Sequence, residues 1–405
     1  MPSSSHTPTQ TASESTVAAT RAGGSSSPTI DSTDRPIRVC HVSMCLLTGG
    51  LERLLVEFSR LHESPGFRPE FVALDELGPP SDDIRAAGCS VTSLQHVSGR
   101  LSRLRHLVQC FREQACDVVH THNTYAHFYA AAAARWAKVP VIINTQHGRG
   151  CGPGWKARSQ FRIANRFADR VVGVSQDAAR LCREQDPRSA TKTIAIHNGI
   201  DVDRFTFHGP NVNANAITVA RLSPEKDFPT LLRAVHLASR DVPEFRLKIV
   251  GDGSERESLE TLTRELQIEE HVEFLGERND VPDLLARSGF FVSSSLTEGI
   301  SLTLLEAMSV GLPVLATAVG GTPEIVVEEQ TGHLVPAGDP TALAAAIVEL
   351  CAHRDAWPAM GQLGRQRVEQ HFSIRTMIRE YETLYRECLA AKQHVDSNHT
   401  PFDQS

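Results

Sequence analysis

The stretch SLTEGISLTLLEAMSVGLPVLATAVGGTPEI, residues 295–325, carries the strongest signal for the fold. It begins with a polar loop, after which Leu302, Leu305 and Met308 recur at the spacing of one helix face. A Gly-Leu-Pro turn at 311–313 ends the helix, and a β-rich apolar run and a Gly-Gly loop follow. The sequence therefore predicts a loop, a helix, a turn and a buried strand in succession.

Two glutamates mark this stretch. Glu298 precedes the predicted helix and Glu306 lies inside it, with seven residues between them. A carboxylate on an otherwise apolar helix needs a partner, because burying a charge alone is costly. The rest of the chain has to supply that partner.

Length and composition narrow the class of protein. The chain has 405 residues, enough for two domains with full cores, and a formal net charge of -7. This charge argues against bulk electrostatic binding of nucleic acid. The nine cysteines are odd in number and form no Cys-x-x-Cys pair, which favours a reducing compartment over a disulfide framework or a zinc site; they are Cys40, Cys45, Cys89, Cys110, Cys116, Cys151, Cys182, Cys351 and Cys388.

The N-terminal segment 1–35 is rich in Ser, Thr, Ala, Gly and Pro, and we expect a disordered extension. It has no apolar run of signal-peptide length, and a transit peptide is less favoured because Arg21 and Arg35 are its only arginines. No apolar window reaches the length of a spanning helix, and the nearest, 129–143, is interrupted by two charged residues.

Alternating strands and helices begin at Ile37. A short β-branched run is followed by Gly49 and Gly50, and then by leucines at helical spacing. Adjacent glycines let the backbone approach a ligand, and a helix N-terminus offers free amides to an anion. A tight turn in any α/β protein is the alternative interpretation.

Histidines follow two later strands of this series. His120 and His122 are two residues apart and would share one face of a strand, just before Asn123. A zinc pair is disfavoured because no third ligand stands at metal spacing, and we expect them to be satisfied or to line a site. His147 follows the strand 139–144, where ligands sit in open α/β sheets.

Two further features have competing interpretations. The helix 99–114 carries arginines around a leucine face and could lie on an anionic membrane, but a small basic cluster favours an ordinary surface helix; the arginines are Arg100, Arg103, Arg105 and Arg112. Asp201 and Asp203 have a metal-carrying spacing, but they lie in a turn before a linker, and we do not expect metal binding.

A second series of strands and helices starts at Ile217, after a linker-like segment. The chain is therefore expected to form two parallel-sheet α/β domains joined by one linker. The predicted parts are the extension 1–35, a first domain 36–205, a linker 206–215, a second domain 216–372, a C-terminal helix 373–393 and a disordered tail 394–405.

Cations and acids of the second domain form one predicted constellation. Arg221 and Lys226 follow its first strand, and with the free amides of the helix after Glu298 they suit a diphosphate. Phosphate would repel Glu306, which should instead face vicinal ribose hydroxyls, while Glu298 lies nearer the group to be transferred. The alternatives are a surface pair of cations and two solvated acids.

The ordered set of motifs resembles a GT-B glycosyltransferase of family 4, the retaining group with a Glu-x7-Glu motif. The resemblance covers about residues 37–390, and its motifs are GGLE at 49–52, NGID at 198–201, RLSPEKD at 221–227, VGDG at 250–253, FLG at 274–276, the segment 298–306 and GGTPE at 320–324. The implied fold has two Rossmann-like domains whose parallel sheets face each other across a cleft, and the C-terminal helix crosses back to the first domain.

This resemblance implies roles for individual residues. The expected catalytic residues are Glu298, His147, Arg221 and Lys226. The expected donor-binding residues are Gly49, Gly50, Arg221, Lys226, Gly251, Gly299, Ile300, Ser301, Leu302 and Glu306, and the acceptor-side candidates are His120, Asn123 and His147. Asp227 departs from the family pattern, in which a glycine often follows the lysine.

The implied activity is the transfer of a sugar from a nucleotide-diphosphate-sugar to a saccharide or lipid-linked acceptor, without a metal or other cofactor. We expect a cytoplasmic protein, with peripheral contact at the inner membrane face through 100–112 as an option. One rival is a Rossmann oxidoreductase or epimerase, although Arg256 replaces the third fingerprint glycine after Gly251 and Gly253. The other is a non-catalytic nucleotide- or sugar-binding module of the same fold.

Overall fold

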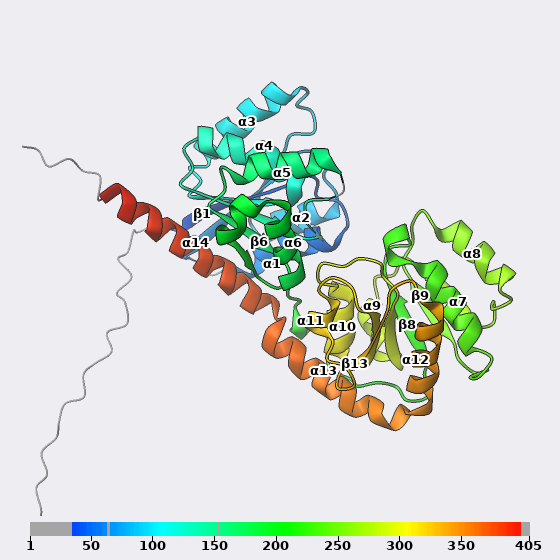
Figure 1. Ribbon diagram of the computed structural model, residues 1–405. Helices are drawn as coiled ribbons and strands as arrows, with labels where there is room; N and C mark the ends of the chain where they lie inside the picture. The colour runs from blue at the N-terminus through cyan, green and yellow to red at the C-terminus, as the bar shows by residue number, and fades with distance from the viewer. Residues whose placement is uncertain (1–34, 63–64, 149, 153, 398–405) are drawn as a thin grey trace, which may run out of the picture. The chain divides into compact units, whose positions relative to one another are not determined.

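A computed structural model describes residues 35–62, 65–148, 150–152 and 154–397 (Figure 1). The predicted disordered extension lies outside the described residues except for Arg35, and so does the tail from residue 398. Among the described residues, no helix is both long enough and apolar enough to cross a membrane.

The first half of the chain forms a parallel sheet. Within the described residues its seven strands run in the order β3-β2-β1-β4-β5-β6-β7. Their bounds are β1 Ile37–Ser43, β2 Phe67–Ala73, β3 Ser90–Ser93, β4 Val118–His122, β5 Val141–Gln146, β6 Arg170–Gly173 and β7 Thr193–Ala195. Both faces of a parallel sheet are covered by helices, which explains why β4 and β5 are buried at every position.

Helices of the first domain connect these strands and are visible around the sheet in Figure 1. They are α1 Gly50–Leu61, α2 Pro79–Ala86, α3 Arg100–Glu113, α4 Asn123–Trp136, α5 Trp155–Asn165 and α6 Gln176–Gln185. The sequence predicted the fourth helix at 125–138, two residues too late, and the following strand at 139–144, two residues too early. Lys138 has a φ of 65°, a left-handed conformation that a right-handed helix does not allow, so the helix ends before it.

The second half forms another parallel sheet, in the order β10-β9-β8-β11-β12-β13. Its strands are β8 Ala216–Val219, β9 Leu247–Val250, β10 Val272–Gly276, β11 Phe290–Ser293, β12 Val314–Thr317 and β13 Gly332–Val335. Its helices are α7 Phe228–Ala238, α8 Arg256–Glu265, α9 Val281–Ala286, α10 Leu302–Val310, α11 Thr322–Ile325, α12 Pro340–Ala352 and α13 Trp357–His371. The segment 295–325 thus has the expected order of loop, helix, turn and strand, with a short helix after the Gly-Gly loop.

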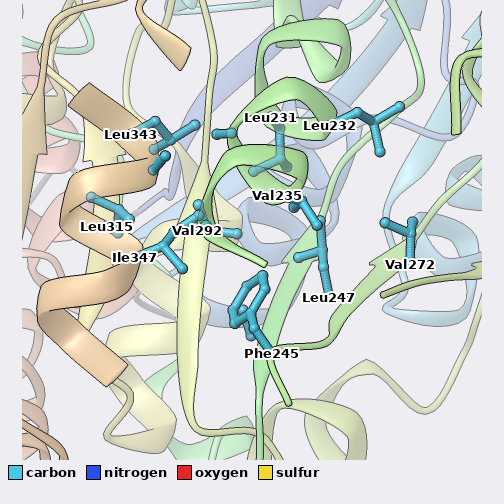
Figure 2. Packing of buried hydrophobic residues seen from close by; sticks show 14 of the residues in the cluster. Leu231, Leu232, Val235, Phe245, Leu247, Val272, Val292, Leu315, Leu343 and Ile347 are labelled. Carbon is cyan, nitrogen blue, oxygen red and sulfur yellow. The ribbon is translucent and has the colours of Figure 1, made fainter. Parts of the chain in front are cut away.

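Figure 2 shows how the second sheet is anchored to its helices. Leu231 and Val235 of α7 and Ile347 of α12 meet Leu247 and Val292 of the sheet, all fully buried. Burying a side chain of this size contributes roughly 1.5–3 kcal/mol. The core therefore fixes the strands against the helices. It thereby also fixes the points at which the loops leave the strand ends.

The last helix, α14 Ile374–Ser397, packs on elements of the first domain. Its Tyr381 ring lies 5.5 Å from Phe58 of α1, and its Tyr385 ring lies 6.1 Å from Phe67 of β2, centroid to centroid. The helix extends to Ser397, four residues beyond the predicted end at 393. The tail was expected to begin at 394, so its first four residues are helical instead.

Both sheets reverse their strand order at one place. In the first sheet β1 neighbours β4, and in the second β8 neighbours β11. The loops that leave such neighbouring strands run in opposite directions, which opens a crevice outside their carboxyl ends where ligands bind in open α/β sheets. The residues that follow β1, β4, β8 and β11 are therefore the first place to look for a site.

Candidate functional site

Lys226 and Glu298 form an ion pair at the carboxyl ends of β8 and β11. The Lys226 Nζ lies 2.6 Å from the Glu298 Oε1, and the Ser295 hydroxyl donates to the same oxygen over 2.7 Å. The Glu298 side chain is 11% exposed and that of Lys226 is 24% exposed. The sequence predicted that both belong to one site, and the structure brings them into contact.

Asp227 explains how the loop after β8 turns. Its φ of 47° and ψ of 48° are left-handed, a conformation that glycine adopts without cost and aspartate tolerates better than most residues. The 3₁₀ turn Pro224–Lys226 precedes it and α7 follows it. Aspartate therefore occupies a left-handed position that glycine would adopt without strain.

Arg221 also follows β8, but its side chain is exposed and reaches toward the first domain. Its Nη2 lies 3.5 Å from the carbonyl oxygen of Thr48, in the glycine loop after β1. Burial raises the pKa of the nearby Glu52 carboxyl, and the positive charge of Arg221 opposes that rise. Arg221 is thus a cation at the glycine loop and is not paired with Glu298.

The loop and helix after Glu298 are mostly packed. Gly299, Ile300 and Ser301 are buried, and Leu302 packs against the cores of both domains. Helix α10 begins at Leu302, and the Ser301 hydroxyl does not cap it. Because the first amides of an α-helix lack intrahelical acceptors, this segment can offer backbone N–H groups, not side chains, to an anion.

Glu306 is buried inside α10, with 4% of its surface exposed. Its Oε1 accepts a hydrogen bond of 3.0 Å from the Arg53 guanidinium of α1, and its Oε2 is buried without a hydrogen-bond partner among the described residues. Burial raises the pKa of this carboxyl, and Arg53 opposes the rise. The interpretation of the two glutamates as solvated charges is therefore wrong.

Arg53 was missed by the sequence analysis, which looked to ribose hydroxyls for the partner of Glu306. It is the fourth residue of α1. The spacing of the leucines in this segment predicted a helix but assigned no role to its charged residues. A guanidinium 253 positions away in the chain meets the carboxylate only through tertiary packing. The unpaired Oε2 still leaves one acceptor for a hydroxyl group.

The predicted glycines have different surroundings. Gly50 lies at the start of α1, where a Cβ would be 3.5 Å from Leu302, and Gly49 is the extended residue before it. Gly251 and Gly253 pack against the backbone of Ala220 and Leu222, where any side chain would clash. These two glycines let the loops after β8 and β9 touch, so they do not support the dinucleotide-fingerprint alternative.

His147 leaves the end of β5 beside the donor-side loop. The carbonyl oxygen of His147 packs directly on Gly299, which leaves no room for a Cβ there. Its backbone N–H donates to the Asn123 Oδ1 over 3.0 Å, so the predicted acceptor-side residue Asn123 holds His147 in place. The His147 Nδ1 is buried and has no hydrogen-bond partner among the described residues.

His120 is fully buried in the middle of β4. Its Nδ1 lies 2.7 Å from the Tyr385 hydroxyl and its Nε2 lies 2.7 Å from the Thr145 hydroxyl. Both nitrogens are therefore satisfied inside the protein. This position fits the interpretation of a satisfied core histidine and does not favour the predicted acceptor-side role.

A third possible metal ligand lies near His120 and His122, although none stands at metal spacing along the chain. His41 of β1 brings a third ring nitrogen near His120 and His122, and the three donor atoms lie within 4.8 Å of one another. A search along the chain misses such a ligand because it comes from the neighbouring strand, about eighty residues away. Asp201 and Asp203 lie elsewhere, and the Asp201 side chain accepts a bond from the Asp203 amide in a turn.

Glu324, which belongs to the quoted Gly-Gly motif but was given no role, connects α11 to the first domain. Its carboxylate accepts hydrogen bonds from the Gln176 and Asp177 amides at the start of α6, at 2.8 and 2.9 Å, and lies 2.7 Å from the His197 Nε2. Burial acts to raise the pKa of Glu324, but these partners outweigh it and lower the pKa. An acid is stabilised at a helix N-terminus, but Glu324 binds the N-terminus of α6, 147 and 148 residues earlier in the chain. The sequence around Glu324 therefore could not reveal this contact.

The basic helix α3 is more exposed than expected. Leu101, on the leucine face of this helix, is 69% exposed, whereas Leu107 is fully buried. Arg103 and Arg112 donate to backbone carbonyls nearby, and Arg100 and Arg105 are exposed. The helix therefore presents an exposed apolar side chain together with two exposed cations at its first turns.

These residues have the chemistry to bind an anion and neighbouring hydroxyl groups. Arg221, Lys226 and the start of α10 supply positive charge and amide donors, while Glu298 and Glu306 supply carboxylate oxygens. Preorganised donors of this kind stabilise developing negative charge without a metal. The His147 ring nitrogen adds a group that can donate or accept a proton.

Two families match the two halves of the chain. Residues 48–204 match the family described as Glycosyltransferase Family 4, and residues 205–367 match the family described as Glycosyl transferases group 1. The boundary between the two matches falls shortly after β7 and before β8.

Curated proteins give the same result. The N-acetyl-alpha-D-glucosaminyl L-malate synthase of Bacillus anthracis is 37% identical over 301 residues, which cover 70% of this chain and 78% of that protein. The UDP-Gal:alpha-D-GlcNAc-diphosphoundecaprenol alpha-1,3-galactosyltransferase of Escherichia coli is 25% identical over 388 residues, covering 89% of this chain and all of that protein.

A solved structure shows the same fold. Anabaena HepE, in complex with UDP and glucose, superposes with a TM-score of 0.76 at 23% identity, covering 86% of this chain and 99% of that one. The likeness confirms the predicted GT-B arrangement of two Rossmann-like domains with parallel sheets.

Proposed function

The chain belongs to the family 4, group 1 glycosyltransferases, and we propose that it transfers a sugar, with retention of anomeric configuration, from a nucleotide-diphosphate-sugar to a hydroxyl acceptor. The observation that carries this proposal is the pairing of Lys226 with Glu298 beside the start of α10, where the second sheet reverses its strand order. Cations, amide donors and carboxylates converge there at the usual ligand position of the fold.

The cations would hold the donor diphosphate and stabilise it as it leaves. An ammonium group has three N–H donors, so Lys226 can keep its bond to Glu298 and still donate to a phosphate oxygen. Arg221 is exposed beside the glycine loop and can approach the same phosphates from the other side. As the bond to the sugar breaks, these charges and the α10 amides meet the growing negative charge.

The carboxylates would bind hydroxyl groups. The unpaired Oε2 of Glu306 is a ready acceptor for a ribose hydroxyl, while Arg53 favours the charged form of the carboxylate. Glu298, held by Lys226 and Ser295, would face the transferred sugar. In this arrangement the departing phosphate takes the proton of the acceptor hydroxyl, which attacks from the same face, and no metal is required.

The acceptor is proposed to be a saccharide or a lipid-linked molecule. One similar protein is named for a diphosphoundecaprenol substrate and another for malate, so relatives of this chain differ widely in acceptor. The exposed Leu101 with Arg100 and Arg105 on α3 supports peripheral contact with an anionic membrane. A lipid-linked acceptor would fit such contact.

The test is a transfer and hydrolysis screen over UDP-, GDP- and ADP-sugars, with and without EDTA. We expect turnover of at least one donor that survives EDTA and gives a product of retained configuration by NMR. Lys226→Ala and Glu298→Gln should each lower kcat by about a hundredfold or more, whereas the exposed controls Lys248→Ala and Glu257→Gln should not. Inversion, or full activity of both site variants, would refute the proposal.

A further inference from the structure

Three histidines form a hydrogen-bonded chain that ends at the site. The His147 Nε2 lies 3.0 Å from the His122 Nδ1, and the His122 Nε2 lies 3.1 Å from the His41 Nδ1. They come from the end of β5, from β4 and from β1, which are neighbouring strands. The chain therefore runs across the sheet, from its core to the donor-side loop.

The protons in this chain are interlocked. A neutral imidazole carries one N–H donor and one acceptor nitrogen, so each ring that donates at one nitrogen accepts at the other. With both bonds formed between neutral rings, either all three rings carry their proton on Nδ1 or all three carry it on Nε2. The tautomer of His147 is thus tied to those of His122 and His41.

The surroundings keep the rings neutral and in place. His41 is enclosed by the rings of Phe58 and Phe71, at 4.7 and 5.2 Å between centroids, and His120 lies 4.3 Å from His122. Burial lowers the pKa of His41 to about 3 and that of His147 to about 3, and it lowers the pKa of His122 as well. A charged ring in the chain is therefore disfavoured.

The open end of the chain is the Nδ1 of His147. This atom is buried beside the backbone contact between His147 and Gly299, and it has no hydrogen-bond partner among the described residues. A buried polar atom without a partner calls for a ligand group. A hydroxyl suits it in either tautomer, because a hydroxyl can both donate and accept.

We propose that His122 and His41 are positioning residues that fix the ring orientation and the tautomer of His147, so that its Nδ1 binds a hydroxyl of the donor sugar. The proposal rests on the glycosyltransferase function proposed above and assigns it two residues that touch neither substrate nor nucleotide. Residues behind a reacting histidine commonly act this way, by selecting the nitrogen that carries the proton.

A metal ion is the competing use of these rings. His41, His120 and His122 could offer three nitrogens to zinc. However, both nitrogens of His120 are engaged by the Tyr385 and Thr145 hydroxyls, and both nitrogens of His122 by histidines. Binding zinc would break these bonds, so the hydrogen-bonded chain is favoured.

The test uses the full chain and reads the imidazole nitrogens directly. Long-range ¹H–¹⁵N NMR of the wild type should show His41, His122 and His147 neutral and in the same tautomer, and the His147 Nδ1 signal should move with UDP-glucose but not with UDP. GDP-mannose and GDP replace this pair if the donor screen selects guanine. In His41→Phe, which keeps an aromatic ring between Phe58 and Phe71, we expect a mixture of tautomers at His147.

Kinetics give the second readout. We expect kcat to fall at least about fivefold in His41→Phe and His122→Phe, with the donor KM changed less than about threefold. His41→Asn, whose side-chain amide can occupy the place of Nδ1, should restore most of kcat. The control His127→Gln removes a buried histidine of the same domain, bonded to Thr121 and Asn165 and outside the chain, and should leave the His147 tautomer unchanged.

The outcomes separate this inference from the proposed function. An unchanged His147 tautomer and unchanged kcat in His41→Phe would overturn the inference while transfer by the wild type stands. A nitrogen shift with UDP alone, or stoichiometric zinc in the purified protein by elemental analysis, would overturn it too. If no donor is turned over, the function fails, and the NMR comparison of the free variants still decides whether the chain sets the tautomer. If His41→Phe does not fold, His122→Phe and His41→Asn carry the same comparison.

Discussion

Replacing Arg53 by methionine tests the partner of Glu306. The change keeps an apolar stem on α1 but removes the guanidinium that hydrogen-bonds this buried carboxylate, while the positive charge of Arg204, which also favours the charged carboxylate, remains. The Arg53 Nη1 lies 3.0 Å from the Glu306 Oε1, with side-chain exposures of 45% and 6%. The variant therefore leaves a buried charge without its partner.

The size of the effect follows from two limits. Coulomb attraction at 3.0 Å amounts to about 5–6 kcal/mol at an effective dielectric constant of about 20. The half-exposed Arg53 reduces this by solvent screening. Glu306 can also escape the loss by binding a proton, which costs about 3.5 kcal/mol at pH 7 and about 1 kcal/mol at pH 5 for an ordinary glutamate. We expect a loss of about 2 kcal/mol at pH 7.5.

The loss should depend on pH with a definite sign. Burial already raises the pKa of Glu306 in the folded state, and removing Arg53 raises it further. A carboxyl with a raised folded pKa destabilises the folded state as pH rises through that pKa. The difference between variant and wild type should thus fall below about 1 kcal/mol at pH 5.

Urea denaturation at pH 5 and pH 7.5 measures this difference. Arg60→Met is the matched control, because Arg60 lies on the same helix and pairs with the exposed Asp83 at 3.4 Å. It should change the free energy of unfolding by less than about 1 kcal/mol at either pH. Equal losses in Arg53→Met and Arg60→Met, or a loss that does not grow with pH, would refute this account of Glu306.

Three further predictions concern other parts of the site. Asp227→Gly should keep activity and raise stability slightly, whereas Asp227→Val should lower the free energy of unfolding by about 1–2 kcal/mol, because residue 227 has a φ of 47°. Equal melting temperatures of the two variants in thermal unfolding would contradict this. Glu324→Gln should cost about 1–2 kcal/mol at pH 7. The cost should shrink as pH falls below the ordinary glutamate pKa and vanish once pH is below the folded pKa of Glu324, because that pKa is lowered. Leu101→Ser should weaken sedimentation with vesicles of anionic lipid, and binding equal to that of wild type would remove α3 from the membrane contact.

The sequence predicted most of what depends on local pattern. Helical spacing after Glu298 and β-branched runs located the elements, and the loops that carry Lys226 and Glu298 were correctly assigned to the ends of strands. Asp227 was recognised as an exception, and its left-handed backbone explains why it is tolerated. These features are encoded within short windows of the chain.

Contacts between distant segments could not be predicted in the same way. Arg53, His41 and Glu324 meet their partners through helix packing, sheet pairing and a helix cap, each across a long separation in sequence. His120 was assigned to the acceptor side because a strand pattern gives its face but not what covers it. Two tyrosines of α14, more than 250 residues away, supply that cover.

Helix α14 has a consequence for synthesis of the protein. Ile378, Tyr381 and Tyr385 of α14 belong to the same core as β1 and β2. The core of the first domain is therefore complete only after α14 has been synthesised. Residues 196–373 emerge from the ribosome in between, which takes on the order of ten seconds or more at about 5–20 residues per second. During that interval the nascent first domain shows the apolar surface around Phe58 and Phe67, where chaperones would be expected to bind.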